Sequence, residues 1–159
     1  MNDYYTECKP WPYPRSSDGI ETLSKFRGMQ SGFKYAEAFE SDLSNWDISN
    51  VTSLAYLFAG TKFSPNIASW DVSNITDMER MFRNTTVFNE DISDWNVSKV
   101  TNMSLMFMNA TAFNQDISSW DVSNVTNMYK MFIKKRIFKQ QISKWEISNV
   151  NKIITMFKS

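Results

Sequence analysis

The chain has 159 residues, of which 42% are hydrophobic, a length that suits one domain or one short repeat array with a substantial core. Seventeen basic and seventeen acidic side chains give a formal net charge of zero, so the total charge does not favour nucleic acid or an anionic membrane as partner. The absence of histidine argues against histidine-based catalysis, and a single cysteine, Cys8, excludes an intramolecular disulfide and a thiolate zinc cage.

The N-terminal residues 1–25 do not follow the pattern of the rest of the chain and are predicted to form a non-repeat arm or cap. They include KPWPYPRSSDG, which is rich in proline and aromatic residues and suits a segment that crosses the first repeat. They contain no apolar run of the length of a secretory signal, and the chain has no stretch of about 18 apolar residues. We therefore expect neither a signal peptide nor a transmembrane segment in this sequence.

Residues 26–159 are predicted to form an array of five clear repeats preceded by one eroded repeat. A tryptophan recurs at intervals of 24, 25, 25 and 25 residues, with aliphatic residues three positions before it and two and five positions after it. These tryptophans are Trp46, Trp70, Trp95, Trp120 and Trp145. The eroded repeat keeps the spacing of apolar residues seen in later repeats, in Met29, Phe33, Ala36 and Phe39.

Each repeat contains two patterns that predict different elements. The stretch I-x-x-W-x-V-x-x-V, as in residues 92–100, alternates apolar and polar positions and predicts a short strand. The next stretch has apolar residues at i, i+3, i+4 and i+7, which predicts a short helix with a threonine as its N-cap. In one repeat these apolar residues are Met103, Met106, Phe107 and Ala110. The predicted N-caps are Thr52, Thr76, Thr101 and Thr126.

One strand and one helix in 25 residues is the arrangement of leucine-rich repeats, in which neither element buries its apolar face alone and successive coils share a core. The predicted fold is therefore an α/β repeat solenoid. It is expected to be a right-handed, leucine-rich-repeat-like coil with about 25 residues per turn, one short parallel strand and one short helix per repeat. We expect the tryptophan column and two phenylalanine columns to dominate its cohesion.

A polar residue directly follows each tryptophan and would lie on the exposed face of the predicted sheet. This column is a candidate partner-binding surface, and it consists of Asp47, Asp71, Asn96, Asp121 and Glu146. Because like charges repel at ladder spacing, cations or a basic partner could balance them. The alternative is that each side chain holds nearby backbone amides in an Asx-type turn, which an asparagine can do equally well. The serine and asparagine columns that follow are predicted to form buried ladders that satisfy turn backbone.

The charge of the chain is distributed unevenly. Residues 1–129 carry nine Lys or Arg and sixteen Asp or Glu, whereas residues 130–159 carry eight Lys or Arg and a single glutamate. A second candidate partner-binding group lies in this basic part: Lys130, Lys134, Lys135, Arg136 and Lys139. These side chains could dock on an acidic protein surface, including the acidic end of another copy. They could equally form a polar capping coil that prevents end-to-end stacking.

The segment FNQDISSWDVSNVTNMYKMF, residues 113–132, resembles the repeat consensus of the BspA-like family. That family has 25-residue repeats and occurs in mycoplasma-type surface lipoproteins and in other bacterial and eukaryotic surface proteins. The resemblance covers about residues 29–157 and includes five copies of the motif. It implies a leucine-rich-repeat-like solenoid, surface attachment or protein binding, a location at the cell surface or outside the cell, and no catalytic residues.

We expect a non-enzymatic protein-binding, adhesion or scaffold module that acts through its repeat surface on a protein partner or on neighbouring copies of the chain. No cofactor, metal or specific nucleic acid partner is expected. The alternative is a structural subunit of a larger assembly, such as a cell-surface layer or virion, docked through its solenoid ends. An enzyme is the third hypothesis, and without histidine it would have to rely on a pair of carboxylates.

Overall fold

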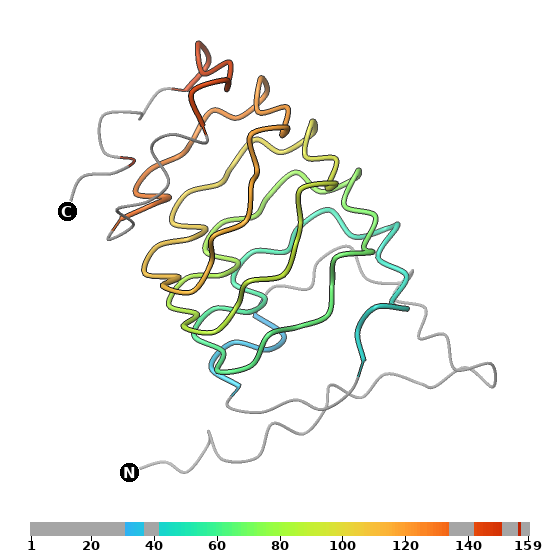
Figure 1. Cartoon of the computed structure of the whole chain (residues 1–159). Coiled ribbons are helices and arrows are strands. Elements are labelled where there is room, and N and C mark those ends of the chain that lie inside the picture. The colour runs from blue at the N-terminus through green and yellow to red at the C-terminus, as the bar shows by residue number, and fades with distance from the viewer. Residues whose placement is uncertain (1–30, 37–41, 134–141, 151–155, 157–159) are drawn as a thin grey trace.

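The computed structural model describes residues 31–36, 42–133, 142–150 and 156. These residues form successive coils that stack on one another, and each coil follows the outline of the previous one (Figure 1). Backbone hydrogen bonds join equivalent positions of adjacent coils, which are 24 or 25 residues apart in the sequence, as between Thr101 N–H and the Thr76 carbonyl at 2.9 Å. The predicted arm, residues 1–25, and its boundary with the repeats lie outside the described residues.

The prediction of an α/β repeat solenoid with one strand and one helix per repeat is wrong. The described residues contain no helix, and their only strand-like pairing consists of isolated parallel bridges. The bridges pair Ser53 with Asp77, Asp77 with Asn102, and Asn102 with Asn127. The rest of each coil consists of tight turns and extended connections, so the coils are held by turn geometry and by bonds between coils rather than by regular elements.

The segment predicted as a helix is a series of β-turns bonded to the next coil. At residues 103–109 every second N–H donates to a carbonyl of the next coil, as Leu105 does to Tyr129 at 2.8 Å. Of the N–H groups between them, those of Met106 and Met108 donate three residues back, as Met108 does to Leu105 at 3.2 Å, and that of Ser104 donates to Asn102 Oδ1 at 3.1 Å. All these donors therefore have acceptors without the i to i−4 bonds of an α-helix, which is why the helical spacing of apolar residues did not produce a helix.

Residues with positive φ explain why these turns cannot become helical. Leu105 has a φ of 60° and Asn109 a φ of 58°, and a left-handed residue every fourth position interrupts a right-handed helix. The positions equivalent to Leu105 are Ser31, Tyr56, Arg80 and Lys130, and those equivalent to Asn109 are Tyr35, Gly60 and Asn84. Gly60 adopts its φ of 73° without strain, and a Cβ there would collide with the ring of Tyr35.

The core contains the apolar columns that the sequence predicts. The four residues at helical spacing in residues 103–110 are fully buried although the backbone is not helical. One phenylalanine column runs through the stack with ring centroids 5.3 to 6.0 Å apart and nearly parallel planes. Its members are Phe33, Phe58, Phe82, Phe107 and Phe132. Stacked aromatic rings at this spacing add to the burial energy and join each coil to the next.

The predictions of a strand and of threonine N-caps in each repeat are also wrong. The stretch at residues 92–100 contains two turns, closed by Trp95 N–H to the Ile92 carbonyl and Val100 N–H to the Val97 carbonyl, so it is not a strand. The threonine hydroxyls cap no helix. Instead the hydroxyls of Thr76, Thr101 and Thr126 each donate to the carbonyl of the preceding threonine in the column, at 3.1, 3.1 and 3.2 Å.

The tryptophan column offers a matched pair of substitutions. The Trp120 indole N–H donates to the Ile92 carbonyl at 3.0 Å, whereas the buried Nε1 of Trp95 has no partner. Trp120→Phe therefore loses a hydrogen bond, and Trp95→Phe removes an unpaired buried donor. We expect Trp95→Phe to cost about 1 kcal/mol less in unfolding free energy than Trp120→Phe, measured by urea denaturation. Equal costs would show that the hydrogen bond contributes nothing to the difference.

Candidate partner-binding surface

The polar column after the tryptophans forms Asx-type turns, as the alternative interpretation predicts. Asp71 Oδ1 accepts a hydrogen bond from Ser73 N–H at 3.0 Å, and Asp121 Oδ1 accepts one from Ser123 N–H at 3.0 Å. Asp47 holds its turn in the same way at 3.0 Å. Asn96 Oδ1 takes the same role at 3.2 Å, so an asparagine substitutes for an aspartate at this position without loss of the turn.

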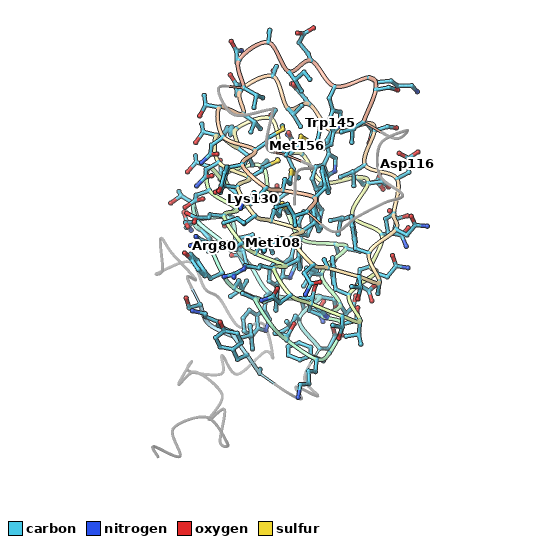
Figure 2. The ribbon with its side chains drawn as sticks, turned by 90° about the vertical axis from the view of Figure 1, so that its left-hand side faces the viewer. Arg80, Met108, Asp116, Lys130, Trp145 and Met156 are labelled. Carbon is cyan, nitrogen blue, oxygen red and sulfur yellow. The ribbon has the colours of Figure 1, made fainter. Side chains whose placement is uncertain are left out.

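A second aspartate column lies four residues before the tryptophans, and the sequence analysis missed it. Asp42, Asp91 and Asp116 each accept a backbone N–H two residues further on, at 2.9, 3.0 and 2.9 Å. The recurring text D-L-S or D-I-S before each of these tryptophans is the signal that could have revealed the column. Figure 2 shows Asp116 at the edge of the stack.

We call residues 42–47, 66–71, 91–96 and 116–121 the Asx face. It contains seven aspartates and no lysine or arginine. The aspartates that carry its charge on successive coils are exposed, and they include Asp71, Asp91, Asp116 and Asp121. Backbone and side-chain hydrogen bonds from the serine two positions on lower the pKa of each of these carboxyl groups. The Asx face is therefore a fixed array of ionised carboxylates at neutral pH.

The asparagine column satisfies backbone groups, as predicted. Asn74 Nδ2 donates to the Ser49 carbonyl at 2.9 Å, and Asn124 Nδ2 donates to the Ser98 carbonyl at 2.8 Å. Both asparagines are exposed, so the prediction of a buried ladder is wrong in that respect. The reason is that each amide reaches the preceding coil along the surface of the stack, where no other coil covers it.

The predicted basic group is described only in part. Lys130 is half-buried, and its Nζ lies 5.2 Å from the centroid of the Tyr129 ring. The other members, Lys134, Lys135, Arg136 and Lys139, lie outside the described residues. Their docking and capping interpretations both stay predictions.

A second surface is formed by the segments with positive φ, residues 31–36, 54–60, 78–84, 103–109 and 128–133, which we call the turn face. Lys34 Nζ lies 5.1 Å from the Tyr35 ring centroid and 5.2 Å from that of Tyr56. The guanidinium of Arg80 lies 4.9 Å from the same Tyr56 ring. Figure 2 shows Arg80 and Lys130 toward the opposite side of the stack from Asp116. Cations held against aromatic rings are thus a feature of this face.

Arg80 and Arg83 come from one coil of the turn face. Arg80 forms an ion pair with Glu79 at 2.9 Å, and the Nε atoms of both arginines are buried and have no hydrogen-bond partner. The sequence analysis did not single out either arginine. Arg80 stands 50 residues before Lys130 in the same column, and aligning the repeats at these positions is the signal that could have identified it.

Acidification tests the Asx turns. Because the folded-state pKa values of Asp71, Asp91, Asp116 and Asp121 are lowered, the stability they contribute is present above the ordinary pKa of 3.8 and is lost as the pH falls through the lower folded values. A four-Asn variant with these residues changed to asparagine should keep the turns and lose less Tm than the unmodified protein between about pH 5 and pH 2.5. Calorimetry measures both. An equal loss would contradict the contribution of these turns.

The sequence of this chain is similar to that of a protein family. A family model described as "Mycoplasma protein of unknown function, DUF285" matches residues 21–91 and residues 60–159. No curated protein and no solved structure matches the chain. Within the part of the chain that the structure describes, no helix has the length and apolar character needed to cross a membrane. The described residues also contain no cluster of three or more potential metal ligands. Since the two matches together span more than half of its length, the chain belongs to the DUF285 family of mycoplasma proteins of unknown function.

Proposed function

We propose that this protein is a non-enzymatic binding or scaffold module that recognises a basic protein surface through its Asx face. The observation that carries the proposal is the concentration of seven aspartates, without a lysine or arginine, on residues 42–47, 66–71, 91–96 and 116–121. Such a surface attracts a basic partner and repels an acidic one, which gives both a faster association and selectivity.

The hydrogen bonds within the Asx face favour binding. One carboxylate oxygen of Asp71, Asp91, Asp116 and Asp121 is already held by a backbone N–H. Such a side chain loses less conformational entropy when a partner binds than a freely rotating carboxylate does. Because all four side chains are exposed, their carboxylates can still contact a partner cation. Repetition on successive coils supplies several such contacts at once.

The resemblance to BspA-like repeats belongs to the same proposal. The repeats of that family occur in surface proteins, and the DUF285 family is described as mycoplasmal. An adhesion or scaffold role at the cell surface is therefore the biological setting that we propose for the Asx face.

The four-Asn variant provides a direct test because Asn96 already holds an Asx turn in the native chain. The probe is an octalysine peptide, and isothermal titration calorimetry at about 50 mM salt measures its affinity, since charges are screened less at low ionic strength. We expect the variant to bind the peptide about tenfold or more weakly than the unmodified protein, which corresponds to at least about 1.4 kcal/mol. Octaglutamate serves as the control, and it should bind the Asx face of neither the unmodified protein nor the four-Asn variant. Equal octalysine affinities would overturn the proposal.

A further inference from the structure

We propose that the turn face of one copy docks on the Asx face of a second copy, so that the chain assembles with itself side by side. This inference rests on the proposed function, because it names the partner of the same Asx face. It commits to a second copy because three cations of the turn face, Lys34, Arg83 and Lys130, have no ion-pair partner among the described residues, and because two of them are spaced like aspartates of the Asx face.

The turn face carries cations that the stack does not neutralise. Its charged residues are Lys34, Glu79, Arg80, Arg83 and Lys130. Glu79 pairs with Arg80, and across the described residues no acidic side chain lies within ion-pair distance of Lys34, Arg83 or Lys130. Rings of tyrosine hold two of these three cations, which limits their motion before a partner arrives. Cations that are held in place and have no ion-pair partner among the described residues are complementary to the fixed carboxylates of the Asx face.

The two faces also have the same spacing along the stack. Lys34 and Arg83 occupy the same column two coils apart, and Asp71 and Asp121 occupy another column two coils apart. Because both faces belong to the same coils, they repeat with the same rise, about 4.8 Å per coil. One relative position of two copies can therefore pair both cations with both carboxylates at once.

Docking between two different faces has a consequence for the size of the assembly. A docked pair leaves one turn face and one Asx face free, so the interaction does not close at a dimer and adds further copies. Association should weaken with salt, because the carboxylates are exposed and the cations are only half-buried, so that solvent ions reach both.

Two variants test this arrangement, and each of them keeps one of the two faces unchanged. The four-Asn variant keeps the turn face, and the variant Lys34→Gln/Arg83→Gln/Lys130→Asn keeps the Asx face. Asparagine suits the positive φ of Lys130, which is 54°. Light scattering at about 50 mM salt should find the unmodified protein in concentration-dependent oligomers that dissociate at about 500 mM salt. Each variant alone should be monomeric, and an equimolar mixture should form a one-to-one dimer and nothing larger.

The controls separate failed folding and failed function from a failed inference. Near-ultraviolet circular dichroism should be unchanged in both variants, and Lys62→Gln, which removes an exposed charge outside both faces, should associate like the unmodified protein. A monomeric unmodified protein at low salt, or a mixture that stays monomeric, would overturn the inference. In that case octalysine binding that still depends on the four aspartates would leave the proposed function standing. Octalysine binding that does not depend on them would remove the proposed function instead.

Discussion

Asn109→Pro is expected to destabilise the protein by about 3 kcal/mol or more. Asn109 has a φ of 58°, whereas proline requires a φ near −65°, and its N–H donates to the Ile133 carbonyl of the next coil at 3.2 Å. The substitution therefore both removes a bond between coils and forces the turn out of its conformation. Urea denaturation followed by tryptophan fluorescence measures the loss in unfolding free energy.

Asn109→Gly is the matched control, because glycine keeps the N–H and tolerates positive φ. Gly60 already occupies the equivalent position two coils earlier. We expect Asn109→Gly to change stability by less than about 1 kcal/mol. If proline and glycine had similar effects, the bonds between coils and the left-handed turn would not control stability at this position.

Phe107→Ala is expected to cost about 3–5 kcal/mol of unfolding free energy. Phe107 is fully buried, and its ring centroid lies 5.6 Å from that of Phe82, 5.8 Å from that of Phe132 and 4.3 Å from that of Phe113. Truncation leaves a cavity at the middle of the phenylalanine column and separates the coils on either side. Chemical denaturation measures the loss.

Val87→Ala is the control for Phe107→Ala, since Val87 is 44% exposed. It should cost less than about 0.5 kcal/mol, as surface substitutions usually do. A loss for Phe107→Ala no larger than that of the control would mean that the column does not hold the coils together.

The burial of side chains could be predicted from the sequence, but the backbone that buries them could not. The apolar residues of residues 103–110 lie in the core as their spacing predicts. That spacing shows only which side chains share a face, and a series of turns with left-handed residues every fourth position places them on one face too. The hydrophobic pattern does not indicate whether a backbone N–H donates within its own segment or to the next coil. In these columns only Gly60, Asn84 and Asn109 are of residue types that signal positive φ, whereas Ser31, Tyr35, Tyr56, Arg80, Leu105 and Lys130 adopt it without such a signal.

The candidate site could be predicted from the sequence only where the type of a residue indicates the hydrogen bond that its side chain makes. Asn96 in a column of aspartates pointed to Asx turns, and the structure confirms them. The cations of the turn face were missed because a helix at residues 78–84 would have placed Arg80 and Arg83 at i and i+3 on a solvated face, where arginines call for no explanation. The tyrosine beside them, Tyr56, comes from the preceding coil and is adjacent only in the stack.

The hydrogen bonds between coils also determine how such a chain can change in length. Each coil bonds to the coils before and after it at fixed offsets, so inserting or deleting a whole 25-residue unit restores every bond, whereas a partial unit leaves donors without acceptors. Each added unit brings one more row to the Asx face. Gene duplication or loss within the array would therefore adjust the valency of the surface, and with it the avidity for a repetitive partner, without any new fold.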